Sequence, residues 1–516
     1  MAKIRLFIIQ LLILSATLTA AQKNNQLIIN ADLGTETISK YIYGHFAEHL
    51  GNCIYGGFWV GEDSPIPNTR GIRNDVINAL KEIDPPVIRW PGGCFADYYH
   101  WKDGIGPREK RPAIINSTWG GVSEDNSFGT HEFLDLCELL GTEAYICVNM
   151  GSGTVQEAAD WVEYVNSDTK SPMTDLRKKN GRDKPWNVKF WAVGNESWGC
   201  GGNMSPEYYT DLYKRYTTYM RAGHLYKVAS GGTSHDYHWT ETVLEKTRHY
   251  RQLIQGYAFH YYTVCHGWNN KGSATQFDED DWFHTMNNTL VMEEHLDNNI
   301  ALMDEYDPDN TIGLMADEWG NWYDVEPGTN PAFLYQQNTL RDAVTAALYL
   351  NIYNNHARRV KMANIAQTIN VLQAMLLTKK DMIVKTPTFY VFKMYKVHQG
   401  ATLLPVHLKC EEYKYNEMVL PAVSASASRD KKGKIHISLA NINPKKDISI
   451  EVEIRGSGNR FDVKGEIITA PSMNDYNDFG RPEKVNLQPY NDFTVSKNSI
   501  IVKLPAKSVV TVTVNE

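Results

Sequence analysis

The sequence predicts an α/β fold: a (β/α)8 barrel followed by a C-terminal antiparallel β-sandwich of jelly-roll-like form. Three observations support this fold class. Eight short apolar runs of strand character alternate with amphipathic helical patterns between residues 40 and 385, as in parallel βα units. After Gly400 the pattern changes to a strict alternation of apolar and polar residues, which favours antiparallel strands. A chain of 516 residues is long enough for a large barrel and a smaller second domain.

The first 21 residues have the pattern of an export signal. Lys3 and Arg5 precede an apolar run, and small residues follow it up to Ala21, as signal peptidase requires. The run is too short to span a bilayer comfortably, and no Cys stands at the cleavage point. We therefore expect residues 1–21 to be a cleaved signal peptide, the mature protein to be periplasmic or secreted, and no membrane attachment to remain.

Residues 22–39 contain one strand-like segment, 26–31, which we expect to join the β-sandwich. Residues 40–385 form the predicted barrel. Apolar residues fall on one helical face within 72–83, 155–165 and 340–348, at the spacing of helices that cover a sheet. The eight strands are expected at residues 41–48, 87–94, 144–149, 188–196, 228–234, 257–262, 312–318 and 362–367.

Residues 386–516 are predicted to form the β-sandwich domain with its leading helix. Thr386 and Pro387 begin that helix, since Pro is favoured in a first helical turn. Apolar residues then alternate with polar ones at 435–439, 448–454 and 510–514, which is the pattern of strands with one buried face.

Composition excludes some partners and leaves the cysteines mostly unpaired. The formal net charge is -8, and Lys and Arg are scattered without a cluster, so we expect no nucleic-acid partner. An aromatic content of 11% is compatible with surfaces that stack on sugars. Seven Cys with no CxxC spacing leave at least one thiol unpaired in the monomer. Most are expected to be free thiols that pack as small apolar residues.

Two of the predicted strands each deliver a glutamate that is flanked by an indole. Glu196 follows an apolar run and Asn195, and Glu318 lies between Asp317 and Trp319. The Asn-Glu dipeptide alone is not informative, because it recurs at 416–417 and 515–516. In a (β/α)8 barrel, however, the carboxyl ends of the strands meet at one face, where the active site lies. Paired carboxylates there are what glycoside hydrolysis needs.

Six motifs together resemble the family 51 glycoside hydrolases, the α-L-arabinofuranosidases. They occur in family order across essentially the whole chain. The motifs are YGHFAEHLG at 43–51, RWPGGCF at 89–95, WKDGIGP at 101–107, GNE at 194–196, DEW at 317–319 and MANIAQ at 362–367.

The resemblance implies a retaining mechanism with two catalytic carboxylates. Glu196 corresponds to the general acid/base and Glu318 to the nucleophile. In retaining enzymes the two carboxyl groups lie roughly 5–5.5 Å apart, so that one attacks the anomeric carbon while the other protonates the leaving oxygen. Arg89, from the second strand, is expected to orient Glu318 as a cation, and His260 to hold Tyr262 or Glu318 in place.

The resemblance also implies a set of sugar-binding residues at the barrel mouth. Glu48 and Gln367 are expected to grip sugar hydroxyls, while Asn195 bonds the 2-hydroxyl. Tyr262 is placed beside the nucleophile, although neighbouring Tyr261 competes for that assignment. The full set is Glu48, Cys94, Trp119, Asn195, Tyr262, Trp322 and Gln367.

Other chemistries compete for some of these residues. Cys94 is expected to touch the arabinose ring and to contribute shape, because a thiol donates only weakly. A cysteine nucleophile is the alternative, but no His-Asn arrangement accompanies it. His235 and His238 could suggest a metal, yet no nearby carboxylate or Cys set completes a site. We predict neither a metal nor an organic cofactor.

The sequence therefore predicts an exo-acting α-L-arabinofuranosidase that removes terminal L-arabinofuranose from arabinan, arabinoxylan or derived oligosaccharides. The resemblance also implies a homo-oligomer, a hexamer. One alternative is another retaining glycosidase, an endoglucanase or a β-xylosidase, because fold and carboxylates alone do not choose the sugar. A second alternative is a non-catalytic carbohydrate-binding protein. Retention of both glutamates and their sugar-contacting neighbours weighs against that second alternative.

Overall fold

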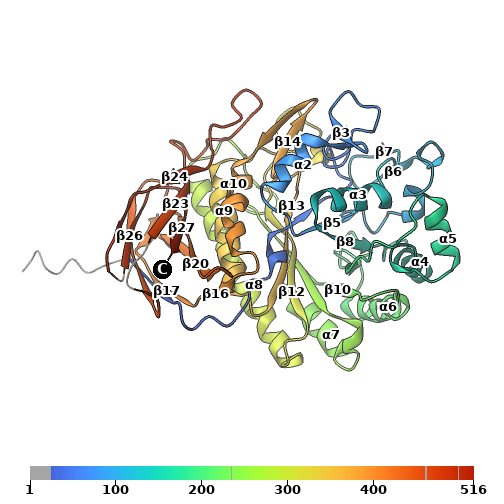
Figure 1. Ribbon diagram of the computed structural model, residues 1–516, viewed down its shortest axis with the longest axis horizontal. Coiled ribbons are helices and arrows are strands. Elements are labelled where there is room, and N and C mark those ends of the chain that lie inside the picture. The colour runs from blue at the N-terminus through green and yellow to red at the C-terminus, as the bar shows by residue number, and fades with distance from the viewer. Residues whose placement is uncertain (1–24, 234, 459–461, 498, 516) are drawn as a thin grey trace, which may run out of the picture.

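A computed structural model describes residues 25–233, 235–458, 462–497 and 499–515 (Figure 1). The predicted signal peptide, residues 1–21, lies outside this range. Within it, we find no helix that combines the length and the apolar character needed to cross a bilayer.

Eight parallel strands close into a barrel and confirm the predicted fold class. In chain order each strand pairs with the next, and the last pairs with the first through Asn364 and Gly44. The strands are β2 (Gly44–Phe46), β5 (Val87–Trp90), β8 (Glu143–Val148), β9 (Phe190–Val193), β10 (Tyr226–Ser230), β11 (Gly256–Thr263), β12 (Gly313–Asn321) and β13 (Val360–Ala366). Side chains that point into the barrel, including Tyr145, Phe190 and Met315, fill its interior as a buried cluster.

Helices surround the barrel. Several begin where the sequence supplies an N-cap and a proline: Ser205 caps α6 by accepting a hydrogen bond from the Tyr208 amide, and Pro206 follows it. The helices are α2 (Asn74–Lys81), α3 (Thr130–Leu140), α4 (Val155–Asn166), α5 (Pro172–Lys179), α6 (Pro206–Tyr219), α7 (Tyr237–Thr247), α8 (Glu279–Tyr306), α9 (Leu340–Asn355) and α10 (Pro387–Tyr395). The first predicted helix begins later than expected, because Ile72 pairs with Thr69 in a short hairpin.

Short hairpins and 3-10 turns occupy the connections of the barrel. The hairpin strands are β3 (Asn68–Thr69) with β4 (Ile72–Arg73), β6 (Ile114–Asn116) with β7 (Val122–Glu124), and β14 (Leu376–Lys379) with β15 (Met382–Lys385). The 3-10 turns are η1 (Lys40–Tyr43), η2 (Trp101–Gly104), η3 (Arg108–Lys110), η4 (Arg251–Leu253), η5 (Pro331–Phe333) and η6 (Lys396–His398).

Two sheets form the β-sandwich beside the barrel (Figure 1). One has the order β17-β1-β22-β26-β25 and the other β16-β20-β21-β27-β23-β24. The sandwich is mostly rather than wholly antiparallel, because β1 runs parallel to β22. Its strands are β1 (Gln26–Asn30), β16 (Thr402–Leu403), β17 (Val406–Lys409), β20 (Val423–Arg429), β21 (Ile435–Asn441), β22 (Ile448–Arg455), β23 (Asp462–Ile468), β24 (Gln488–Tyr490), β25 (Phe493–Val495), β26 (Ser499–Leu504) and β27 (Ser508–Asn515), with a separate hairpin of β18 (Glu412–Tyr415) and β19 (Met418–Pro421).

Helix α9 joins the two parts. Every residue from Leu340 to Asn354 is buried, because the helix packs on the barrel and also against β20 and β21. Its asparagines bond to sandwich strands: Asn351 Nδ2 donates to Ser424 Oγ and Asn354 Nδ2 donates to Ser426 Oγ, both at 3.2 Å. The interface between the barrel and the sandwich is therefore buried and contains both apolar packing and hydrogen bonds.

Candidate active site

The predicted site residues meet at the carboxyl ends of the barrel strands. They are delivered by separate strands or by the loops directly after them, which is where (β/α)8 barrels carry chemistry. A small cavity of about 40 Å³ lies between them. Eight predicted residues line it: Glu48, Cys94, Trp119, Glu196, Tyr262, Glu318, Trp322 and Gln367.

Glu318 lies at the centre of this arrangement and is only 5% exposed. Arg89 Nη1 donates to its Oε1 at 2.6 Å, and the Tyr262 hydroxyl donates to its Oε2 at 2.8 Å. The other end of the guanidinium, Nη2, donates to Asn195 Oδ1 at 2.7 Å. A cation and a hydroxyl therefore hold the two oxygens of this carboxylate in a fixed orientation. The contact of Tyr262 also decides against Tyr261, whose hydroxyl donates to the backbone carbonyl of Asn288.

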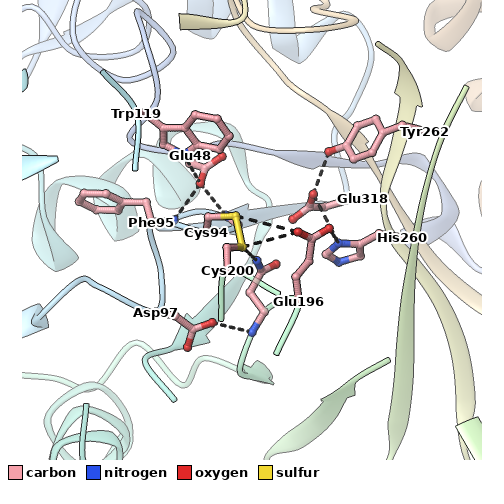
Figure 2. The surroundings of a disulfide bond; sticks show 12 residues. Glu48, Cys94, Phe95, Asp97, Trp119, Glu196, Cys200, His260, Tyr262 and Glu318 are labelled. Carbon is pink, nitrogen blue, oxygen red and sulfur yellow. Dashed lines mark hydrogen bonds and ion pairs between the residues drawn. A yellow bond between two sulfur atoms is a disulfide. The ribbon is translucent and has the colours of Figure 1, made fainter. Parts of the chain in front are cut away.

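Glu196 lies opposite Glu318 across the cavity. A Glu196 oxygen and a Glu318 oxygen lie within 4.8 Å of each other. The turn that presents Glu196 is tight: its φ is 39°, and the preceding amide of Asn195 donates to Asp97 Oδ2 at 2.9 Å. Asp97 therefore fixes the loop after β9, and Figure 2 shows it below the two carboxylates. This separation is that of two carboxylates which can act on opposite sides of one glycosidic bond.

His260 bridges the acidic groups. Its Nδ1 lies 2.9 Å from Glu196 Oε1, and its Nε2 lies 3.0 Å from Asp317 Oδ1. Burial lowers the pKa of His260, but the charge of Glu318 and the hydrogen bonds to Asp317 and Glu196 outweigh it and raise the pKa to about 10. The ring is therefore doubly protonated at neutral pH, and both nitrogens donate.

Asp317 balances that charge. Burial raises the pKa of its carboxyl, whereas the charge of Arg89 and the hydrogen bonds from His260 and Tyr145 lower it, and the net pKa lies below the ordinary value. The Tyr145 hydroxyl donates to Asp317 Oδ2 at 2.8 Å. Asp317 thus holds the imidazolium from the side away from the cavity.

Glu48 is held by donors from several loops. Its Oε1 accepts from the Phe95 amide at 3.1 Å and from Trp119 Nε1 at 3.0 Å, while Gln367 Nε2 donates to Oε2 at 3.1 Å. Burial and the charge of Glu318 raise the pKa of Glu48, the donors from Phe95 and Trp119 oppose this rise, and the result is about 7. A carboxyl group with such a pKa can accept hydrogen bonds from sugar hydroxyls or donate one.

Cys94 differs from the expectation of a free thiol, because it forms a disulfide with Cys200. The two Cα atoms are 5.5 Å apart, within the normal range for a bridge. The other five cysteines are free, and four of them are buried, which confirms that most of the seven are unpaired. Sequence reasoning missed Asp97 and Cys200, although they lie just beyond the motifs at 89–95 and 194–196. The bridged cysteines are 106 residues apart in the chain. The spacing of cysteines along the sequence does not reveal such a pair.

Within the described ranges, some His, Cys and acidic residues are grouped closely enough to hold a metal. Cys94 and Cys200 offer no thiolate because they are bridged, and both ring nitrogens of His260 already contact carboxylates, those of Glu196 and Asp317. The remaining groups surround His266 near the start of α8, away from the cavity. His235 and His238 do not form a site with each other: His235 contacts His295, and His238 lies on α7 near Glu207. We assign a metal to none of these groups.

Comparison with known proteins places this site in a family. A model of the α-L-arabinofuranosidase C-terminal domain matches residues 317–508, and a model of the α-L-arabinofuranosidase 1 domain matches residues 79–264. An intracellular exo-α-L-arabinofuranosidase from Bacteroides ovatus is 54% identical over 95% of this chain and 96% of its own. The chain belongs to the family 51 α-L-arabinofuranosidases. It is therefore a glycoside hydrolase.

Solved structures of this family agree with the observed fold. The arabinofuranosidase of Xanthomonas axonopodis pv. citri is 46% identical, with a TM-score of 0.93 over 95% of this chain and 100% of its own. The arabinose complex of the Thermotoga maritima enzyme is 30% identical, with a TM-score of 0.83 over 95% and 99% of the two chains. A bifunctional glucanase-xylanase, CelM2, is only 12% identical with a TM-score of 0.62, so it shows a shared fold alone.

One prediction requires correction. Residues 1–21 led us to expect an exported protein, whereas the Bacteroides ovatus relative, matched over 95% of this chain, is named as an intracellular enzyme. The periplasmic or secreted location is therefore withdrawn. A charged, apolar and small-residue pattern at an N-terminus is short and degenerate, which explains why it misleads.

Proposed function

We propose that this hydrolase is a retaining, exo-acting α-L-arabinofuranosidase. The observation that carries the proposal is the approach of one Glu196 oxygen and one Glu318 oxygen to within 4.8 Å. Inverting enzymes hold their carboxylates roughly 6.5–9.5 Å apart to admit a water molecule, whereas retaining enzymes do not. The proposed roles follow from the neighbours of each group: Glu318, charged and held by Arg89, attacks, while Glu196 moves protons.

In the first step a Glu318 oxygen attacks the anomeric carbon. The bond from that carbon to the leaving oxygen breaks, and the leaving oxygen takes the proton from Glu196. Because His260 donates to Oε1 of Glu196, the transferable proton resides on Oε2. The products are a covalent glycosyl ester on Glu318, an ionised Glu196 and the released alcohol of the substrate.

In the second step water attacks the anomeric carbon and displaces Glu318 from it. Ionised Glu196 takes a proton from the attacking water, the bond between the anomeric carbon and Glu318 breaks, and both carboxyl groups return to their starting states. The Tyr262 hydroxyl and Arg89 stabilise the carboxylate that leaves. Two displacements at one carbon restore its configuration.

The shape of the cavity supports exo action on a terminal sugar. Its volume of about 40 Å³ is below the roughly 300–1,000 Å³ of ordinary ligand pockets. Trp119, Trp322, Leu334 and Leu372 wall it, while Glu48 and Gln367 direct polar groups into it. We propose terminal L-arabinofuranose of arabinan, arabinoxylan or their oligosaccharides as the substrate. The name of the Bacteroides ovatus relative, which includes exo action, supports this choice. Assembly into hexamers stays a prediction.

The test compares single-carboxylate variants on aryl arabinofuranosides with good and poor leaving groups. Glu318→Ala should lose roughly 10⁴-fold in kcat/KM on every substrate, because no nucleophile remains. Glu196→Ala should lose about 10²–10⁴-fold on poor leaving groups and much less on good ones, which depart without a proton. Proton NMR of the first product should show the anomeric configuration of the substrate.

Glu294→Ala, on the exposed face of α8, is the control and should match the wild type. The β-D-xyloside and β-D-glucoside counterparts should stay intact. An inverted first product, or equal losses by Glu196→Ala on good and poor leaving groups, would contradict the proposed mechanism.

A further inference from the structure

A disulfide bond lies directly against the proposed acid/base. Cys94 follows β5 and Cys200 follows β9, so the bridge ties together two loops that border the cavity (Figure 2). The Sγ atom of Cys200 lies 3.6 Å from Glu196 Oε2, and that of Cys94 lies 3.9 Å from the same oxygen. Because bridged sulfur atoms carry no hydrogen, these approaches are contacts and not donated hydrogen bonds.

In the proposed mechanism, the oxygen that the sulfur atoms contact is the one that transfers the proton. His260 donates to Oε1 of Glu196, which leaves Oε2 for the proton and for the leaving oxygen of the substrate. The charged or titratable groups that face Glu196 are His260, Glu318 and Tyr262, besides the bridge itself. Of these, none places a donor on Oε2 within the described part of the chain. The disulfide therefore shields Oε2 without hydrogen-bonding to it.

We propose that the Cys94–Cys200 disulfide keeps hydrogen-bond donors away from Oε2 of Glu196, and that its reduction by a dithiol therefore weakens catalysis. The proposal rests on the acid/base role proposed for Glu196. Reduction breaks the S–S bond with two electrons and two protons from the dithiol, which itself closes to a cyclic disulfide. Two S–H groups then face Oε2. Donors to a carboxylate favour its ionised form, and an ionised Glu196 has no proton for the leaving oxygen.

The bridge is accessible to a reductant. Cys200 is exposed, so a thiolate from solvent reaches its sulfur. Four of the five free cysteines are buried and only Cys410, in the sandwich domain, is half-buried. A response to reduction therefore reports on the bridge at the cavity.

The test measures kcat/KM against pH for the full chain, oxidised and after treatment with dithiothreitol, using an aryl α-L-arabinofuranoside with a poor leaving group. Thiol titration after denaturation should rise from five free cysteines to seven. The alkaline limb of the profile should move to lower pH by about one unit, with about tenfold lower kcat/KM above it. A chelator is included, because reduced Cys94 and Cys200 would place metal ligands beside Glu196.

Two double variants distinguish hydrogen-bond donation to Glu196 from mechanical support of the loops by the bridge. Cys94→Ser with Cys200→Ser removes the bridge but keeps two donors, so its alkaline limb should lie at the reduced position and should not respond to dithiothreitol. Cys94→Ala with Cys200→Ala removes bridge and donors, so its limb should stay at the oxidised position even if the looser loop lowers kcat. Cys410→Ser, remote from the cavity, should respond to dithiothreitol as the wild type does.

A fully reduced wild type with an unchanged alkaline limb and unchanged kcat/KM would overturn the proposal. Equal losses in the Ser and Ala pairs without any movement of the limb would also overturn it, because the bridge would then act as a brace alone. Failure of the proposed function is a different result: Glu196→Ala would keep its activity on poor leaving groups, whatever reduction does.

Discussion

His260 shows how a single side chain sets the electrostatics of the site. It contacts Glu196 and Asp317 through different ring nitrogens and lies 3.5 Å from Glu318. Because all of these neighbours are acidic, the doubly protonated ring is favoured despite its burial. In the proposed mechanism, the bond from the imidazolium to Oε1 leaves Oε2 of Glu196 to transfer the proton. This function depends on three contacts that His260, on β11, makes with the loop after β9 and with β12.

The pKa of His260 predicts how its contribution to stability changes with pH. The pKa is raised from 6.5 to about 10 in the folded protein, so the folded state holds a proton that the unfolded state loses. This contribution is complete below pH 6.5 and disappears as pH rises through about 10, by up to about 1.4 kcal/mol per pH unit. Denaturant unfolding of the wild type and His260→Gln between pH 6 and 10 should therefore give a shrinking difference. A constant difference across that range would show that the ring is neutral.

At the scale of elements, the loop after β9 is the most constrained segment of the site. A Cβ atom at Gly201 would lie 1.9 Å from the Asn195 carbonyl oxygen and 2.7 Å from Asp97 Oδ2. Asp97 also accepts hydrogen bonds from the amides of Met150 and Gly151. The loops after β5, β8 and β9 are therefore packed around one buried carboxylate.

Gly201→Ala should displace Asn195 and Glu196 and so reduce kcat/KM by about tenfold or more, since small misplacements of reacting groups are costly. Gly199→Ala is the matched control in the same loop, because its Cβ would meet nothing closer than the Glu196 carbonyl oxygen at 3.7 Å. Steady-state kinetics on an aryl arabinofuranoside measure both. If the two variants behave alike, the close packing of Gly201 is not what holds the loop.

Much of the barrel could be predicted from the sequence, because each strand is a short apolar run that ends in a polar motif. Those runs overlap all eight barrel strands. The first helix was misplaced at Ile72, where an apolar residue fits either a helix face or a hairpin. The parallel pairing of β1 with β22 and the bond of Cys94 to Cys200 were missed for a common reason. Both join segments far apart in the chain, and local patterns carry no information about such pairing.

The same limit applies to the site. Strand ends and motifs were enough to nominate Glu196, Glu318 and their neighbours, and the structure brings them around one cavity. The role of each residue stays a proposal. The positions of protons could not be predicted, since they depend on distances such as those from His260 to Glu196 and Asp317.

For the whole molecule, the buried helix α9 indicates that the barrel and the sandwich unfold together. Contacts between the two extend beyond α9: Trp282 Nε1, on α8, donates to the Ile442 carbonyl oxygen at 2.9 Å. All 13 tryptophans lie between residues 59 and 322. Because Trp282 contacts the sandwich, a Trp282→Phe background restricts the fluorescence signal to the barrel. If the two parts unfold together, destabilisation of the sandwich should therefore shift the unfolding midpoint measured by tryptophan fluorescence of the barrel.

Adjacent residues of β26 supply a matched pair for this test. Ile500 is fully buried, whereas Ile501 is 42% exposed. Ile500→Ala should lower the free energy of unfolding by about 3 kcal/mol, and Ile501→Ala by much less, because only the first leaves a cavity. In a cooperative molecule, the fluorescence midpoint of the Trp282→Phe protein in denaturant shifts with Ile500→Ala, although every remaining tryptophan is in the barrel. If circular dichroism reports the loss of the sandwich while the fluorescence midpoint stays in place, the two parts unfold independently and α9 does not couple them.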